Sequence, residues 1–278
     1  MSQSPTDLPI TVIEPNTGWI SLNLPEIWRY RDLLRLLVWR DVSARYRQSV
    51  LGIFWAMFRP LITALIYTLV FSVFVRVKTD IPYPIFAFSA LIPWLYFSNA
   101  LSAVTSSVSG ASNLLSKVYF PRLILPLAAI GPGLIEVLIQ LIIVAGMMAV
   151  YQYPPTLALF ALPFFIALTS LTALAFGIWL TALNVKYRDV GMSVPFFVQI
   201  WMYLCPIVYP ISMVPERFRS LYSLNPMVGV IEGFRWSLLG ASSPDWTAMI
   251  MSAATLSVLL ISGLYFFRRT EASFADVI

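Results

Sequence analysis

The longest uncharged stretch of the chain runs from residue 137 to residue 185, and it constrains the fold more than any other feature. An α-helix rises ~1.5 Å per residue, so about 20 apolar residues cross a hydrocarbon core of ~30 Å. The stretch is therefore long enough for nearly two crossings. The residues YQYPP at 151–155 interrupt it and predict the turn between two membrane spans.

Further apolar runs on either side complete a prediction of six transmembrane helices. These runs are continuously apolar and do not alternate with a period of two, which excludes a membrane β-barrel. Only 11% of the residues are charged and 59% are hydrophobic, whereas about a quarter are charged in soluble domains. We therefore predict an all-α integral membrane protein with spans at 53–75, 85–108, 123–150, 156–183, 194–214 and 246–267.

Six crossings place both termini on one side, and the basic residues indicate which side. Most Lys and Arg residues fall on the side of the termini, whereas the opposite side carries only Arg76, Lys78, Arg217, Arg219 and Arg235. Lys and Arg are retained on the cytoplasmic face during insertion, so both termini are expected in the cytoplasm. The net charge of +5 then reflects topology and gives no support to nucleic-acid binding.

The sequence predicts three regions along the chain. Residues 1–24 are polar and contain prolines, without a basic start followed by a short apolar core, so we expect a flexible cytoplasmic tail and no cleavable signal. Residues 25–50 are expected to form an amphipathic interface helix, and residues 51–278 the six-helix transmembrane domain.

The residue types exclude several kinds of chemistry. Cys205 is the only cysteine and the sequence has no histidine, so disulfides and Cys/His metal or redox sites are not expected. No Walker-type phosphate loop or other glycine-rich nucleotide fingerprint occurs. We therefore expect no cofactor on this chain and a source of energy outside it.

The predicted interface helix carries its apolar side chains on one face: Ile27, Tyr30, Leu34, Leu37 and Val38. Basic, aromatic helices of this kind lie in the plane of the membrane boundary. Helical spacing continues the apolar stripe onto Asp41 and Arg45, which are costly to place in lipid. Either the helix turns near Arg40, or this end meets protein.

Two more segments are predicted on the cytoplasmic side. The segment 110–126 exposes apolar residues that need either a partner protein or the chain's own helices as a cover. Its residues 113–120 can form two helical turns before Pro121. The loop NVKYRDVG at 184–191 carries three charged residues, which either belong to a shared docking surface or form a solvated stop signal.

The connection 214–245 on the opposite side predicts a helical hairpin. Asn225 suits the N-cap and Gly240 the C-terminal cap of a helix over 226–239. At roughly 21 Å this helix is too short to cross the membrane. With the segment 215–223, it is expected to dip into the outer leaflet as a moving element or to form an interfacial cover.

A few charged residues are predicted at or near membrane depth. Glu136 lies mid-membrane with Gln140 one helical turn later, so it is either functional or a protonated carboxyl bonded between helices. Glu232 and Arg235 lie three residues apart in the outer hairpin and can pair.

Several stretches together carry a resemblance to a known family: RYRQSVLG before the first span, LIPWLYFSNAL, NLLSKVYFPRLILPL, LNVKYRDV, PIVYP, VPERFRSLYSLNPMVGVIEGFRW and the terminal FADVI. In these motifs and their order, the chain resembles the membrane subunit of ABC-2 type polysaccharide exporters, especially the O-antigen export permeases. The resemblance runs from about residue 25 to the C-terminus.

The resemblance implies a homodimer of this chain and two copies of a separate ATPase subunit that binds ATP and Mg. It implies export of a lipid-linked polysaccharide, O-antigen or a related glycan, across the bacterial inner membrane. It also implies a cytoplasmic coupling helix at 113–122 and outer gate helices at 215–224 and 226–239. The residues expected to couple to the ATPase are Leu115, Ser116, Lys117, Tyr119, Phe120, Arg122, Lys186, Arg188, Asp189, Asp41 and Arg45, and those of the outer gate are Asn225, Glu232 and Arg235.

A polysaccharide conduit should bind sugar faces weakly at many sites, and aromatic side chains meet that need. We predict a path along Tyr67, Phe71, Phe74, Phe197 and Trp201, with helix packing or lipid contact as the alternative for each. Two other function classes stay open. One is an ABC-2 permease for another lipid or small molecule. The other is a membrane glycosyltransferase or polymerase, whose catalytic carboxylates should lie on polar loops, whereas the outward acids here are scattered.

Overall fold

The structure is a computed structural model that describes residues 24–47, 52–115, 117–240, 245–271 and 274. Ser116 lies outside these residues, as do residues 1–23 of the expected tail and residues 48–50 of the expected interface helix. The helices follow in the order α1 (Leu24–Arg29), α2 (Arg31–Tyr46), α3 (Gly52–Tyr67), η1 (Thr68–Phe74), α4 (Tyr83–Ser106), η2 (Ser109–Ala111), α5 (Ser112–Leu115), α6 (Ile124–Ala129), α7 (Gly131–Val150), η3 (Leu157–Ala161), α8 (Leu162–Lys186), α9 (Asp189–Tyr203), η4 (Ile211–Met213), α10 (Glu216–Ser223), α11 (Pro226–Leu239) and α12 (Trp246–Glu271).

Five of the six predicted spans correspond to helices that are long and apolar enough to cross a membrane. In the described part of the chain these helices are Phe54–Phe74, Tyr83–Ser106, Ile124–Val150, Leu157–Lys186 and Trp246–Glu271. The first joins α3 to the wider π-helical turns of η1. The turn predicted at 151–155 lies between α7 and η3, as expected.

The remaining predicted span, 194–214, is wrong as a single helix. α9 begins at Asp189 and ends at Tyr203, and its 15 residues are too few to cross the hydrocarbon core. Pro206 and Pro210 follow shortly after, and neither can donate the backbone hydrogen bond that would continue a helix. The chain therefore runs on through 204–210 without a regular helix.

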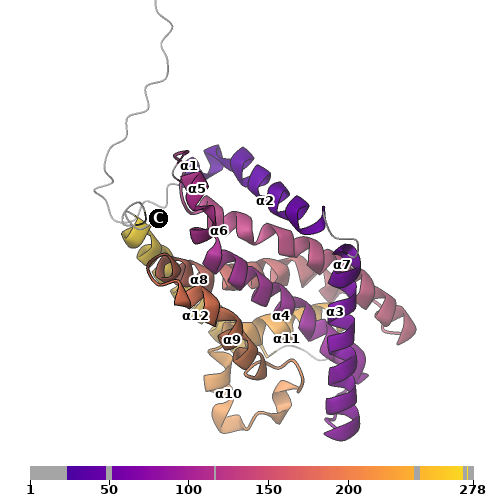
Figure 1. The fold of residues 1–278 in the computed structure, drawn as a ribbon. Coiled ribbons are helices and arrows are strands. Elements are labelled where there is room, and N and C mark those ends of the chain that lie inside the picture. Colours follow the sequence, from indigo (N-terminus) through magenta and orange to yellow (C-terminus); the bar gives the residue numbers. More distant parts are fainter. Residues whose placement is uncertain (1–23, 48–51, 116, 241–244, 272–273, 275–278) are drawn as a thin grey trace, which may run out of the picture.

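α4 forms the centre of the bundle and packs against α8, α7, α11 and α3 (Figure 1). In the most apolar part of α4, 78% of the residues are buried inside the protein. In the most apolar part of the α3–η1 span, only 11% are buried. The α3–η1 span therefore directs most of its apolar side chains away from the chain's own core. α12 packs against α8 and α11.

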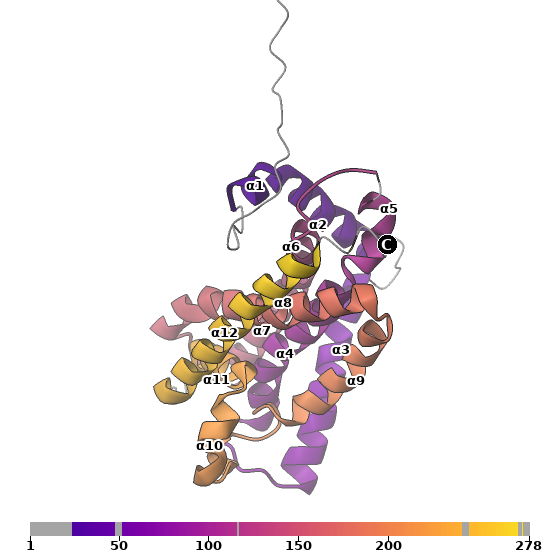
Figure 2. The ribbon, with the colours of Figure 1, turned by 90° about the vertical axis from the view of Figure 1, so that its left-hand side faces the viewer.

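α2 lies across one end of the bundle and α10 lies at the other, which we name the α2 end and the α10 end (Figures 1 and 2). The predicted apolar face of the interface helix is confirmed, because Leu37 is buried and Val38 packs beside it. A Cβ atom at Gly131 would lie 2.7 Å from Val38 Cγ1, so glycine permits this close approach of α2 to α7. The predicted single helix is interrupted at Tyr30, which separates α1 from α2.

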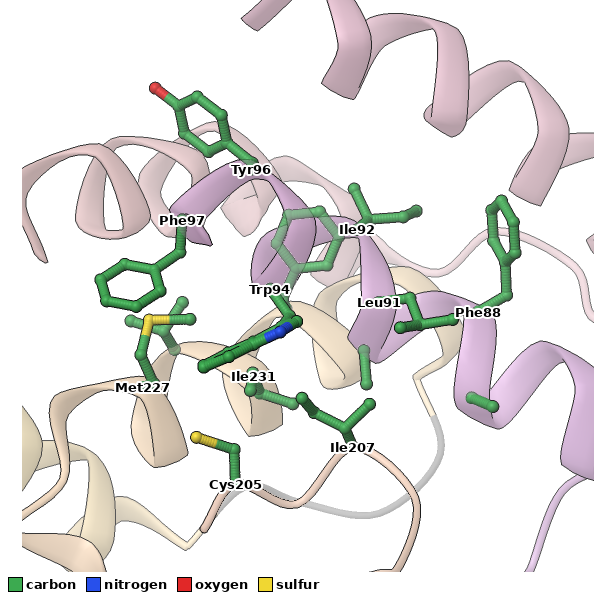
Figure 3. Close-up of a cluster of buried hydrophobic side chains, with 14 of the residues drawn as sticks. Phe88, Leu91, Ile92, Trp94, Tyr96, Phe97, Cys205, Ile207, Met227 and Ile231 are labelled. Carbon is green, nitrogen blue, oxygen red and sulfur yellow. The ribbon is translucent and has the colours of Figure 1, made fainter. Parts of the chain in front are cut away.

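α11 lies inside the bundle and is covered by the chain's own helices. It packs against α12, α4 and α8, and all of its 14 residues except Glu232 and Trp236 are buried. Figure 3 shows Ile231 of α11 in one cluster with Trp94 of α4 and Ile207 of the 204–210 segment. The helix is apolar because the protein covers it on most sides.

Candidate functional site

The predicted coupling helix is much shorter than expected. α5 ends at Leu115, and Lys117, Tyr119 and Phe120 lie outside helices. Pro121 explains the difference, because its ring disfavours the helical conformation at the preceding residue and so discourages a helix that reaches Phe120. Ser116 lies outside the described residues.

The apolar side chains of this segment divide between the surface and the interior. Tyr119 is 73% exposed and Val118 is 49% exposed, so both can meet another protein. Phe120 is only 3% exposed and packs in a cluster with Leu37 of α2 and Val108. The expectation that Phe120 contacts a partner is therefore wrong, and its role is to anchor the segment.

Arg122 also makes contacts within the chain. Its backbone N–H donates to Glu271 Oε1 at 3.3 Å, and its guanidinium donates to the Glu271 backbone carbonyl. The guanidinium carbon lies 5.7 Å from the ring centre of Phe274. Arg122 therefore links the segment after α5 to the end of α12.

The predicted loop 184–191 is almost absent, because α8 ends at Lys186 and α9 begins at Asp189. Lys186, Arg188 and Asp189 are all exposed. The ammonium of Lys186 lies 5.3 Å from the ring centre of Tyr187, a cation–π distance. The three charges thus lie on a tight turn between two helices.

Asn184 joins this turn to the segment before α5, a role that was not predicted from the sequence. Its Nδ2 donates to the Thr105 carbonyl at 3.2 Å and to Ser109 Oγ at 3.1 Å. Its Oδ1 accepts from Gly191 N–H at 2.8 Å. A buried amide in an apolar helix requires such partners, and that requirement was the available signal.

A polar cleft of ≈ 710 Å³ opens beside this junction. Ser109 and Ser112 line it from one side, and Lys186, Arg188 and Met192 line it from the other. The cleft therefore brings two of the predicted coupling residues together with residues 109–115 (η2 and α5), which we name the α5 segment. Among the described residues, no group of three or more Asp, Glu, Cys or His side chains could hold a metal ion.

The far end of α2 meets the transmembrane helices through an ion pair. The Arg45 guanidinium contacts the Glu136 carboxylate of α7, whose second oxygen accepts from Asn99 Nδ2 at 3.1 Å. Asp41 pairs with the adjacent Arg40 at 2.8 Å. Of the two sequence alternatives, the end of α2 therefore meets protein. Burial, followed by the charge of Glu136, raises the pKa of Tyr46 above its usual value.

The α10 end holds the predicted hairpin, α10 and α11. The Asn225 side chain accepts from Met227 N–H at 3.1 Å, and Gly240 has a φ of +59°, so both predicted caps are confirmed. Arg235 and Glu232 pair at 2.6 Å as the spacing indicated. Arg235 is only 7% exposed, which the sequence did not indicate.

The 204–210 segment takes its hydrogen-bond donors from side chains. Asn225 Nδ2 donates to the Leu204 carbonyl at 3.0 Å, and Arg235 Nη2 donates to the Pro206 carbonyl at 2.7 Å. The Tyr83 hydroxyl donates to the Val208 carbonyl at 2.8 Å. Irregular backbone at membrane depth requires such donors from the surrounding protein, and the hairpin supplies two of them.

The five residues predicted to line a substrate path do not share one surface. Tyr67 and Phe71 pack against the central core, and the Tyr67 hydroxyl donates to a methionine sulfur of α9 at 3.1 Å. Trp201 packs edge-on against two phenylalanine rings, with ring centres 5.1 and 4.7 Å away. Phe74 and Phe197 are exposed. The path itself stays a prediction.

Known proteins resemble the chain over most of its length. It is 32% identical over 256 residues to the O-antigen export system permease protein RfbA of Myxococcus xanthus, a match that covers 91% of this chain and 98% of that protein. An O-antigen export system permease protein RfbA of Klebsiella pneumoniae is 27% identical over 89% of this chain and 95% of its own length. The polysialic acid transport protein KpsM of Escherichia coli is 22% identical over 84% of this chain and 91% of its own length.

The matching family covers the elements described above. Residues 32–239 match the family described as ABC-2 type transporter, and this range contains α2 from Asp32 on, the α5 segment, the α8–α9 turn and α11. The chain therefore belongs to the ABC-2 type transporter membrane family.

Proposed function

We propose that the chain is the membrane permease of an ATP-driven exporter that moves a lipid-linked cell-surface polysaccharide, O-antigen or a related glycan. The observation that carries this proposal is the match to the Myxococcus xanthus RfbA protein along 91% of the chain, because that protein is named for O-antigen export. The weaker match to a polysialic acid transporter supports polysaccharide export as the shared activity.

The proposed assembly is a homodimer of this chain with two copies of a separate ATPase subunit, which hold ATP and Mg. It lies in the bacterial inner membrane with the α2 end and both termini in the cytoplasm. Exposed basic residues at the α2 end, such as Lys186 and Arg188, support this orientation. α9 and the following residues 204–214, together with the buried hairpin, make the fifth of the six passages through the membrane in chain order.

The ATPase subunit docks on the cleft between the α5 segment and the α8–α9 turn. Asn184 supports this assignment because it holds both segments together through three hydrogen bonds. A chain without its own phosphate loop can respond to ATP only through contacts that differ between the states of its partner. A surface whose two parts move as one body can transmit such differences to α4 and α8.

The hairpin at the α10 end acts as the outer gate. Support comes from the way Asn225 and Arg235 hold the 204–210 segment, since displacement of α11 would release the carbonyls of Leu204 and Pro206 together. The gate role would make Glu232 a positioning residue that orients Arg235.

A deletion and complementation experiment tests the function. The gene for this chain is removed from a strain that encodes it, and surface glycan and lipid-linked glycan are measured by immunoblotting of whole cells and of membrane extracts. We expect surface glycan to disappear while lipid-linked glycan accumulates inside the cell, and plasmid-borne wild-type chain to restore export. Unchanged surface glycan in the deletion strain would contradict the proposal.

The docking surface has its own test. Asn184→Leu should reduce the amount of ATPase subunit that co-purifies with the permease, because the α5 segment and the α8–α9 turn lose their link. Thr169→Val is the matched control, since Thr169 is a buried residue of the same helix whose hydroxyl donates only to the Phe165 carbonyl. Equal co-purification of Asn184→Leu and wild type would place the docking surface elsewhere.

A further inference from the structure

A polar cavity of ≈ 240 Å³ lies where the end of α2 meets α3, α4 and α7. It is separate from the cleft beside the α8–α9 turn and from the hairpin. Six polar side chains line it: Arg45, Tyr46, Arg59, Asn99, Glu136 and Gln140. Among these, two guanidinium groups face a single carboxylate, which gives the cavity an excess of positive charge.

Arg59 supplies this excess charge. Arg45 is paired with Glu136, and the second oxygen of Glu136 is taken by Asn99. Arg59 lies within the span Phe54–Phe74, and it has no ion-pair partner among the residues that the structure describes. Arg59 is exposed and lies near the beginning of the span, where an Arg side chain reaches the headgroup region, so an anionic lipid headgroup is the natural complement of its charge.

Two further groups in the cavity have unused hydrogen-bonding capacity. Gln140 is only 4% exposed, and its Oε1 atom accepts no hydrogen bond within the described chain. The Tyr46 hydroxyl is buried and is likewise without a hydrogen-bond partner there. Buried polar groups are satisfied by protein, ordered water or a ligand in native proteins, and a ligand with hydroxyl donors would supply the partners that these two atoms need.

We infer that this cavity binds the sugar-phosphate headgroup of a glycan lipid, with the phosphate on Arg59 and the first sugar on Gln140 and Tyr46. The inference rests on the proposed export function and names a binding site for its substrate. The phosphate accounts for the free guanidinium. Sugar hydroxyls account for Gln140 Oε1, which needs a donor that an ionised phosphate lacks.

The surroundings of Arg59 accommodate the rest of such a lipid. Phe58, Leu61 and Ile62 of α3 are exposed beside it, so an apolar tail can lie along this helix while the headgroup occupies the cavity. At ~30 Å³ for each water molecule the cavity holds about eight waters, which is room for a headgroup and not for a polymer.

Calorimetric titration of the purified full-length chain in dodecyl maltoside tests the site with three probes: farnesyl phosphoryl glucose, farnesyl phosphate and dioctanoyl phosphatidylglycerol. We expect farnesyl phosphoryl glucose to bind most tightly. Arg59→Gln should weaken both farnesyl probes at least tenfold. Gln140→Leu should weaken only the probe that carries the sugar. Lys78→Gln, which lies outside the cavity, is the matched control for loss of charge.

These titrations test the anion site, the class of lipid and the sugar contact separately. Equal affinity of Arg59→Gln and wild type for farnesyl phosphate would overturn the anion site. Phosphatidylglycerol binding as tightly as the glycolipid would assign the cavity to a phospholipid. Gln140→Leu removes an unsatisfied buried group, so its melting temperature should not fall and its loss of binding cannot be attributed to unfolding. Normal surface glycan in the deletion strain would instead refute the proposed function, whatever the probes show.

Discussion

At the residue scale, Glu136 connects three helices at one point, because its carboxylate meets Arg45 of α2 and Asn99 of α4. The carboxylate is largely buried, whereas the Arg45 side chain is 40% exposed, which reduces the cost of breaking the pair. We expect Glu136→Gln or Arg45→Gln to lower the free energy of unfolding by about 1–2 kcal/mol, and the double substitution to lower it by less than the sum. Thermal unfolding of the purified chain measures this.

The exposed pair Arg35–Asp32 provides the control, because its side chains are 75% and 79% exposed. Arg35→Gln should change the free energy of unfolding by no more than about 0.5 kcal/mol. Strictly additive effects of the two substitutions at Arg45 and Glu136 would show that the pair has no coupling energy.

The second prediction at the residue scale concerns Arg235. A surface pair with Glu232 would contribute under ~1 kcal/mol. The structure instead buries Arg235, with its guanidinium 3.8 Å from the Phe86 ring centre and bonded to the Pro206 carbonyl. Arg235→Gln should therefore lower the free energy of unfolding by about 3–5 kcal/mol, and Glu232→Gln by less.

The double substitution should not recover the stability lost in Arg235→Gln, because the Pro206 carbonyl would still lack its guanidinium donor. Thermal unfolding gives the stability, and ion leak in reconstituted vesicles tests the gate. If the double variant were as stable as wild type, Arg235 would contribute to the free energy of unfolding only through its contact with Glu232.

At the scale of elements, the contact of α2 with α7 depends on the absence of a side chain at Gly131. Gly131→Ala should move α2, because the added Cβ would lie 2.7 and 2.8 Å from the two Cγ atoms of Val38. We expect a loss of about 1–3 kcal/mol in the free energy of unfolding. Gly146→Ala in the same helix has no atom within 4 Å of the new Cβ and should stabilise the chain by about 0.5–1 kcal/mol.

Both glycine variants are measured by thermal unfolding and by co-purification of the ATPase subunit. A Gly131→Ala chain as stable as wild type would show that α2 shifts without cost and that the close approach to Gly131 contributes nothing to stability.

The elements also show which information a sequence carries. Five spans and both caps of α11 followed from local composition and from residues such as Asn225 and Gly240. The prediction of one helix over 194–214 was wrong because apolar residues indicate that a segment is buried, but they do not show whether its backbone hydrogen bonds are helical. Cys205 and Ile207 are apolar because protein covers them. The coupling helix is shorter than predicted, and Pro121 disfavours the helical conformation at Phe120 directly before it.

The residue pairs at the candidate sites also differ in how far the sequence could predict them. Glu232 and Arg235 are three residues apart on one helix, so their pairing was readable from spacing. Arg45 and Glu136 are 91 residues apart, and only the packing of α2 on α7 brings them together. Phe120 and Arg122 were expected to face a partner because nothing in the local sequence indicates Leu37 or Glu271 as their neighbours.

At the scale of the whole molecule, the α3–η1 span has the largest uncovered apolar face. Leu65, Ile66 and Leu69 are among its exposed residues, beyond the part at Phe58–Ile62 that the proposed lipid tail covers. In the proposed homodimer this further part of the face meets the second copy. Leu65→Cys, in a chain whose Cys205 is replaced by serine, should form disulfide-linked dimers in oxidised membranes. Ile261→Cys on α12, where the native side chain is 69% exposed, should not. Non-reducing electrophoresis distinguishes the two, and cross-linking through Ile261 alone would assign the dimer to α12.

One of the side chains that hold the 204–210 segment, Asn225, also contacts the thiol of the chain's single cysteine. Cys205 has no exposed surface, and Asn225 Nδ2 lies 3.3 Å from its sulfur as well as bonding to the preceding carbonyl. A movement of the hairpin that exposes Cys205 would therefore raise the rate at which its thiol is alkylated, and this rate reports the movement. Faster alkylation during ATP turnover would time the opening of the gate without a foreign label.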